Sequence, residues 1–150
     1  MNHHEEYMKI ALSLAQEARD NGEIPVGAIV VVNGEIVSQA CNEKEMRGDA
    51  TAHAEILALQ RAAAQLGQWR LSDATMYVTL EPCSMCAGAM VQARLGNLVL
   101  GAYDPRAGAA GSVVDLLDHP AFNHRVIVKS GVLAEECGQI LKEFFDTRRR

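Results

Sequence analysis

The spacing of apolar residues changes along this chain, and the changes predict a helix, a hairpin and then further strands and helices. Over residues 5–21 apolar positions recur every three or four residues, which is the spacing of one helix face, and Gly22 suits the position just past a helix end. Residues 28–32 and 35–40 are predicted strands because they flank Asn33-Gly34, a pair typical of a tight β-hairpin turn.

Strands and helices follow one another through the rest of the chain. Residues 42–50 are polar and predict a loop, which leads into a helix that begins at Thr51 or Ala52 and runs to Leu66, before Gly67. The remaining predicted elements are strands over residues 75–80, 97–102 and 125–129, a helix that Pro82 opens and that runs to Ala93, and a last helix over residues 134–147.

This order of elements predicts an α/β fold. Strands that alternate with helices after Ala74 imply crossover connections, and therefore a parallel stretch of sheet beside the antiparallel hairpin. We expect a mixed five-stranded sheet with helices on both faces. In such sheets, ligand sites lie at the carboxyl ends of the strands, where loops enter the N-termini of helices.

Composition fits a single domain spanning residues 1–150, because 49% of the residues are apolar and a chain of this length can bury a sizeable core. No apolar run approaches the roughly 18 residues of a membrane span, and the acidic start lacks the basic region of an export signal. We therefore expect a cytoplasmic protein with no membrane partner. Of the four cysteines, Cys41 and Cys137 stand alone and are expected to be small buried residues.

Net charge alone argues against a nucleic-acid partner, but its distribution does not. The formal net charge is −5, and residues 1–75 hold 6 basic and 11 acidic side chains, whereas residues 76–150 hold 8 of each. The chain ends on three arginines, Arg148 to Arg150, which form a local basic cluster. Such a cluster can contact phosphates or can be a solvated tail, and the sequence leaves both open.

Two short motifs point to a metal centre. Cys83 and Cys86 stand three residues apart, so in a first helical turn their sulfur atoms lie on one face. His53 would complete a set of one imidazole and two thiolates, which leaves a fourth tetrahedral position on zinc for water. His53 and Glu55 are two residues apart and cannot converge from the middle of a helix, so the ion has to sit over helix ends.

Glu55 is the candidate catalytic base. Two thiolates cancel the charge of the zinc ion and leave the bound water less acidic, which makes a nearby carboxylate useful for taking its proton. The alternative is that both motifs are coincidental, with His53 in the core and Glu55 in solvent. Their occurrence together, each before a predicted helix, favours the metal centre.

These motifs resemble those of zinc-dependent nucleobase deaminases, which carry H-x-E followed by P-C-x-x-C. The chain resembles the cytidine deaminase superfamily and, over nearly its full length, the bacterial tRNA-specific adenosine deaminases. The match runs through Ile24-Pro25-Val26-Gly27-Ala28, Thr51-Ala52-His53-Ala54-Glu55, Leu80-Glu81-Pro82-Cys83-Ser84-Met85-Cys86, Gly108-Ala109-Ala110-Gly111-Ser112, Asn123-His124-Arg125 and Phe144-Phe145. The resemblance implies a three-layer α/β/α, cytidine deaminase-like fold.

The resemblance also implies a reaction. One Zn2+ per subunit, held by His53, Cys83 and Cys86, would activate water to attack C6 of adenine, while Glu55 moves the proton to the ring and then to the leaving amine. The implied substrate is the first anticodon base of a tRNA, an arginine acceptor, within the anticodon stem-loop. An unpaired loop presents such a base without the cost of opening a duplex. The family is homodimeric.

Further positions match the family's substrate contacts. Asn42 corresponds to a residue that holds the purine edge, although a loop asparagine can equally bond its own backbone. The other positions implied to contact substrate or RNA are Ala54, Asn123, His124, Arg125, Phe144, Phe145, Arg148 and Arg149. Of the two adjacent phenylalanines we expect one buried and one exposed. Glu81 could orient a neighbouring group or cap its own turn, and we favour the turn.

Two other functions remain open at this point. A deaminase of a free base, nucleoside or nucleotide, such as guanine, cytidine or deoxycytidylate, would keep the metal chemistry and lack the RNA surface. A zinc-stabilised RNA-binding module without catalysis would keep the metal and not need Glu55.

Overall fold

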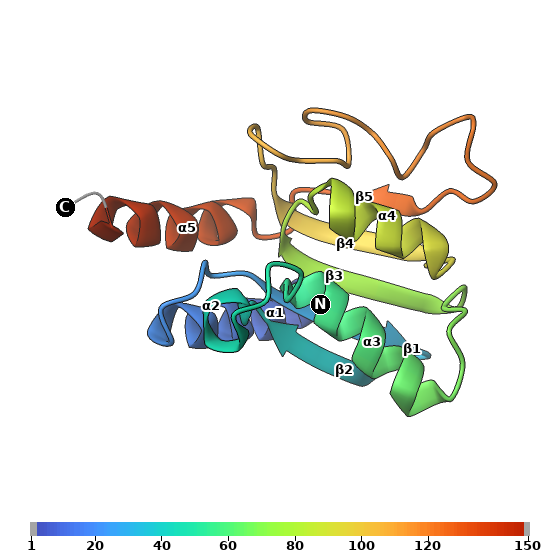
Figure 1. Cartoon of the computed structure of the whole chain (residues 1–150), viewed down its shortest axis with the longest axis horizontal. Coiled ribbons are helices and arrows are strands. Elements are labelled where there is room, and N and C mark those ends of the chain that lie inside the picture. Colours follow the sequence, from blue (N-terminus) through green and yellow to red (C-terminus); the bar gives the residue numbers. More distant parts are fainter. Residues whose placement is uncertain (1–2, 149–150) are drawn as a thin grey trace.

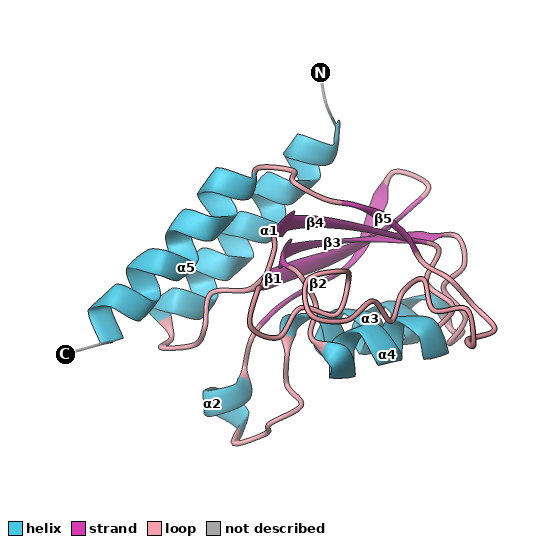
Figure 2. Cartoon of the chain, turned by 90° about the horizontal axis from the view of Figure 1, so that it is seen from above, coloured by secondary structure: helices cyan, strands magenta, loops and turns pink. Residues whose placement is uncertain are grey.

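A mixed five-stranded sheet forms the middle layer of the computed structural model, which describes residues 3–148 (Figures 1 and 2). Its order is β2-β1-β3-β4-β5. β1 is antiparallel to both β2 and β3, whereas β3, β4 and β5 are parallel. The strands are β1 (Gly27–Val32), β2 (Glu35–Cys41), β3 (Ala74–Leu80), β4 (Asn97–Ala102) and β5 (Ile127–Lys129).

Helices cover both faces of the sheet (Figure 2). One face carries α1 and α5, which contact each other, and the other carries α3 and α4 (Figure 2). The helices are α1 (His3–Asp20), α2 (Lys44–Arg47), α3 (Ala54–Leu66), α4 (Ser84–Gln92) and α5 (Ala134–Arg148). The predicted three-layer α/β/α arrangement is therefore confirmed.

The core has two halves because side chains of a strand point alternately to the two faces of the sheet. Ile29 and Val31 of β1 pack towards α1 with Met8, whereas Val30 packs towards α3 and α4 with Met90. Burial of these apolar side chains contributes about 1.5 to 3 kcal/mol each to stability. The isolated cysteines, Cys41 and Cys137, are both buried, as expected.

α1 lies against β1 at a point where only glycine fits. A Cβ atom at Gly27 would collide with the Ala11 carbonyl oxygen and would lie 2.8 Å from the Leu14 Cβ. This close approach ties the first helix to the first strand. Within residues 3–148, no helix is long and apolar enough to cross a membrane.

Three predictions about local structure were wrong. The predicted loop over residues 42–50 contains α2, because the buried Glu23 carboxylate accepts hydrogen bonds from the Glu45 and Met46 N–H groups at the start of this helix. Pro82 precedes α4 rather than opening it, since the chain stays extended at Cys83 (φ −74°, ψ 177°). The helix that follows the polar segment likewise starts at Ala54, not at residue 51 or 52.

The connection between β4 and β5 is a long irregular segment, residues 103–126, in which the structure has no helix. It folds on itself through hydrogen bonds such as those from the Val113 N–H to the Gly108 carbonyl and from the Leu116 N–H to the Ala109 carbonyl. β5 is shorter than predicted, with three residues, and all three are exposed.

Candidate active site

Two helix N-termini meet at one edge of the sheet. β2 and β3 run in the same direction, because both are antiparallel to β1, so their carboxyl ends lie at the same edge. α4 follows β3 directly, and α3 follows β2 through α2. His53 is the residue before α3 and Cys83 the residue before α4, each with extended backbone angles.

His53, Cys83 and Cys86 form the group of potential metal ligands that the described residues contain. Their ligand atoms all lie within 4.8 Å of one another. The His53 Nδ1 atom is 3.7 Å from the Cys83 Sγ and 3.5 Å from the Cys86 Sγ. A tetrahedral zinc ion with bonds of about 2.3 Å to sulfur and about 2.0 Å to nitrogen requires N-to-S separations of about 3.5 Å. The donor set therefore has the spacing and the chemistry that zinc requires.

Hydrogen bonds among the three side chains shift their pKa values. A hydrogen bond from the Cys86 thiol lowers the pKa of Cys83 to about 3 against the opposing effect of burial, and His53 contributes further lowering. The same hydrogen bond, together with burial, raises the pKa of Cys86. Hydrogen bonding to Cys83 raises the pKa of His53. Metal binding needs the neutral imidazole and both thiolates, so it releases the protons that these contacts hold.

Glu55 lies beside the triad in the first turn of α3 and is 4% exposed. Burial raises the pKa of its carboxyl to about 7, although its own backbone N–H and the charge on His53 act in the opposite direction. A carboxyl with a pKa near neutrality can both take up and release a proton at working pH. Such perturbed groups are concentrated at functional sites.

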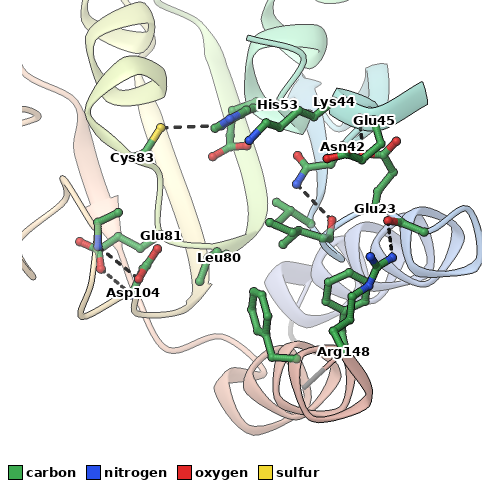
Figure 3. Close-up of a pocket in the computed structure, with 17 residues that line it drawn as sticks. Glu23, Asn42, Lys44, Glu45, His53, Leu80, Glu81, Cys83, Asp104 and Arg148 are labelled. Carbon is green, nitrogen blue, oxygen red and sulfur yellow. Dashed lines mark hydrogen bonds between the residues drawn. The ribbon is translucent and has the colours of Figure 1, made fainter. Parts of the chain in front are cut away.

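A cavity of about 480 Å3 opens over these residues. His53, Glu55 and Cys83 line it together with Leu80, Ile24 and Val26, so it joins polar groups to an apolar wall (Figure 3). This combination of an apolar cavity and a few polar groups is typical of a small-ligand site.

Asn42 lines the cavity, and its side chain also organises the site. The Asn42 Oδ1 accepts a hydrogen bond of 2.7 Å from the Ala54 N–H. Its Nδ2 donates to the Ile24 carbonyl at 3.1 Å (Figure 3). Asn42 thus satisfies a backbone group at the start of α3 that would otherwise lack a partner. Ala54 is fully buried at this position.

The C-terminal helix closes the other side of the cavity. Phe144 is 7% exposed and Phe145 41% exposed, which gives the expected pair of one buried and one exposed ring, and both line the cavity. The Arg148 guanidinium lies 4.6 Å from the centre of the Phe144 ring and donates to the Gly22 carbonyl at 2.7 Å. Arg149 lies outside the described residues.

Asn123, His124 and Arg125 do not line this cavity in the described structure. The His124 Nε2 is 2.7 Å from the Leu95 carbonyl oxygen, beyond the end of α4. Arg125 pairs with Asp118 at 3.1 Å on an exposed surface. This segment is therefore separate from the metal triad within one chain.

Sequence reasoning missed several groups of the cavity wall, namely Glu23, Lys44, Glu45, Asp104 and Ala107. The role expected for Glu81 was also wrong: its carboxylate does not cap its own turn but accepts hydrogen bonds from residues 104, 110 and 112. The glycines and alanines of residues 108–111 were the signal that could have indicated this, because such small residues allow a backbone to fold closely around a side chain.

The chain matches known deaminases over its full length. The family model of MafB19-like deaminases matches residues 1–149. The tRNA-specific adenosine deaminase of Bacillus subtilis (strain 168) is 49% identical over 150 residues, which are 100% of this chain and 93% of that protein. The tRNA-specific adenosine deaminase of Haemophilus influenzae is 48% identical over 146 residues, 97% of this chain and 84% of that protein.

Solved structures agree. A structure from studies of A-to-I editing by tRNA:A34 deaminases at the wobble position of transfer RNA is 41% identical, with a TM-score of 0.88, over 91% of this chain and 99% of that one. Sequence and fold thus match the same class of proteins. This chain belongs to the MafB19-like deaminase family and is similar to the bacterial tRNA-specific adenosine deaminases.

Proposed function

We propose that this chain catalyses the hydrolytic deamination of adenosine to inosine at the first anticodon position of a tRNA, with zinc as its metal. The observation that carries the proposal is the convergence of His53, Cys83 and Cys86 within 4.8 Å, at a cavity that the buried Glu55 also lines. The relatives at 48 and 49% identity are named tRNA-specific adenosine deaminases, which supports the same reaction here.

The metal ligands and Glu55 divide the chemistry between them. His53, Cys83 and Cys86 would hold the ion, which when bound would supply the Lewis acidity that makes a water molecule a better nucleophile. The Glu55 carboxylate would take one proton from the attacking water and deliver it to N1 of the adenine ring while the water oxygen bonds to C6. Glu55 would then move the proton of the new C6 hydroxyl to the exocyclic amine, the bond from C6 to that nitrogen breaks, and ammonia leaves, so that water and adenosine become inosine and ammonia.

The cavity suits a single extruded base. A volume of about 480 Å3 is within the range of small-ligand pockets and too small for a base pair in its helix. Phe145 offers an exposed ring for stacking, and the Asn42 amide retains hydrogen-bonding capacity for a purine edge beside its two backbone bonds. Ala54 does not line the cavity itself but lies behind its wall, where its backbone N–H donates to the Asn42 side chain.

Further contacts to the anticodon stem-loop are part of the proposal. Arg148, which lines the cavity, would contact a phosphate next to the extruded base, and a phosphate contact is proposed for Arg149 from the family resemblance alone. Parts of the anticodon loop that lie away from the cavity would contact Asn123, His124 and Arg125. We propose an arginine-accepting tRNA as the substrate and the cytoplasm, where thiols stay reduced, as the compartment.

We also propose a homodimer. Large apolar side chains are exposed along the irregular segment and β5, namely Val113, Val114, Phe122, Ile127 and Val128. Exposed apolar surface of this kind favours an interface. Light scattering coupled to size-exclusion chromatography should give about twice the mass of 16.3 kDa, and a monomer at micromolar concentration would reject the dimer.

A substrate comparison tests the proposed function. Zinc-loaded protein is incubated with an anticodon stem-loop carrying adenosine at the first anticodon position, and separately with free adenosine, guanine, cytidine and deoxycytidylate. We expect inosine in the stem-loop and no ammonia from the free compounds. Release of ammonia from a free compound with the stem-loop unchanged would reject the RNA substrate in favour of the free-base alternative.

Glu55→Ala separates catalysis from RNA binding alone. We expect this variant to keep zinc and lose turnover by about 10² to 10⁴-fold, because it removes the proton carrier and leaves the ligands. Glu35→Ala removes an exposed carboxylate in the hairpin and is the matched control. Full turnover by the Glu55 variant would reject the mechanism.

A further inference from the structure

The Glu81 side chain lies at the end of β3, two residues before Cys83, and is 2% exposed. Its carboxylate accepts backbone hydrogen bonds from Asp104 at 2.9 Å, from Ala110 at 2.9 Å and from Ser112 at 3.1 Å (Figure 3 shows the first). The Ser112 hydroxyl donates to it as well. All four donors come from one irregular loop, residues 104–112, so a single side chain gathers this loop.

The loop is folded tightly around the carboxylate. A Cβ atom at Gly108 would collide with the carboxyl group of Glu81 and would lie 2.5 Å from the Asp104 carbonyl oxygen. The Ala109 N–H also donates to the Pro82 carbonyl at 2.8 Å, directly before the first metal-ligating cysteine. The loop and the metal-binding turn are therefore joined twice, through the Glu81 side chain and through the Pro82 carbonyl.

The same loop supplies part of the cavity wall. Asp104 and Ala107 line the cavity with Glu81. Asp104 and Glu81 lie opposite the side formed by Asn42 and Lys44 (Figure 3). The loop contains no helix or strand that would hold it by itself. Without the carboxylate, three backbone N–H groups would lose their partner, which is costly for each group that stays buried.

We propose that Glu81 is a positioning residue that holds the 104–112 loop against the metal-binding turn and so sets the wall on which the substrate base and its ribose rest. This inference rests on the proposed function. Glu81 acts through the loop, since both of its oxygens accept hydrogen bonds from it. The side chain is not one of the three clustered ligands of the described residues.

Glu81→Gln tests the proposal in the full-length, zinc-loaded protein. Glutamine keeps the size of the side chain but replaces one accepting oxygen with an NH2 group, which cannot accept from the backbone N–H groups of the loop. The loop should therefore detach from this side chain. We expect KM for the anticodon stem-loop to rise about tenfold while kcat changes less than threefold and zinc content stays at one per chain. Hydrogen exchange followed by mass spectrometry should accelerate at least tenfold in peptides that cover residues 104–112, and stay unchanged in α1.

A second, milder variant tests the same contact in case Glu81→Gln does not fold. Ser112→Ala removes one hydrogen bond of the same carboxylate and should raise KM by about threefold. Combined with Glu81→Gln it should add nothing further, because both changes act on one loop. Glu35→Gln is the matched control at an exposed position. If Glu81→Gln does not fold, the KM of Ser112→Ala decides.

The outcomes separate this inference from the proposed function. Unchanged KM together with unchanged hydrogen exchange in Glu81→Gln would overturn the positioning role, as would a fall in kcat at constant KM or a loss of zinc. If wild-type protein does not deaminate the stem-loop, the proposed function fails. In that case, hydrogen exchange in the 104–112 peptides still decides whether Glu81 holds the loop.

Discussion

Removing the carboxylate of Glu55 should change the pH dependence of stability in the metal-free protein. Burial raises the pKa of this group from 4.5 to about 7 in the folded chain. Between these two values the folded state keeps the proton that the unfolded state has released. Stability therefore falls as pH rises through this window, because the folded state binds more protons than the unfolded state.

The size of the effect follows from the difference between the folded and unfolded pKa values. The interval from 4.5 to about 7 corresponds to about 3 kcal/mol, at about 1.4 kcal/mol for each pH unit. Glu55→Gln removes the ionisable group, so the variant should not show this fall in the free energy of unfolding as pH rises. Relative to the wild type, the variant should gain about 3 kcal/mol between about pH 4.5 and about pH 8, with most of the gain complete near pH 7.

Urea unfolding of chelator-treated, reduced protein at several pH values measures this difference. The gap between the unfolding free energies of wild type and Glu55→Gln reports the titration of Glu55 together with its effect on His53 and Cys86, whose pKa values Glu55 raises. Glu35→Gln, at an exposed position, should follow the wild-type curve. A gap that stays constant within about 0.5 kcal/mol from about pH 5 to about pH 8 would refute the assignment of Glu55 as a buried carboxyl that holds a proton near neutrality.

Three further predictions concern the ligands, the core and the C-terminal helix. Cys86→Ala should weaken zinc binding by more than about 100-fold, measured by competition with a chromophoric chelator, and unchanged affinity would exclude Cys86 as a ligand. Gly27→Ala should lower the free energy of unfolding, measured in urea, by about 1 to 3 kcal/mol because its Cβ meets α1. Gly138→Ala, whose Cβ meets nothing within 4 Å, should raise it by about 0.5 to 1 kcal/mol. Equal effects of the two substitutions would contradict the packing of α1 on β1. Phe144→Ala should lower the free energy of unfolding by about 3 kcal/mol, because its ring is buried. Phe145→Ala should change it by less than about 0.5 kcal/mol and raise KM for the stem-loop about tenfold, because its ring is exposed for stacking. The reverse pattern would exchange the roles of the two rings.

Much of the fold could be predicted from the sequence because its signals are local. The Asn33-Gly34 pair fixes the hairpin, and the helical spacing before Gly22 fixes α1. The start of α4 was misplaced because proline is compatible with both the first helical position and an extended residue before it. In the extended conformation seen here, the Pro82 carbonyl accepts a hydrogen bond from the distant Ala109 N–H.

The metal triad could be predicted because spacing within each motif limits where its side chains can point. Glu23 and Glu81 could not, since their partners lie more than twenty residues away along the chain. The small residues 108–111 indicate that a backbone can fold closely there, but they do not indicate which distant side chain it folds around. Asn42 lines the cavity, and its bond to the Ala54 N–H at the start of α3 is a contact that the sequence did not indicate.

The central claim is that the triad and Glu55 together convert adenosine to inosine in an anticodon. The most direct measurement is sequencing of tRNA after incubation with purified, zinc-loaded protein, in parallel with Glu55→Ala. We predict that adenosine at the first anticodon position is read as guanosine after wild-type treatment and stays adenosine after treatment with the variant. Unmodified anticodons after wild-type treatment, with zinc bound at one ion per chain, would contradict the account.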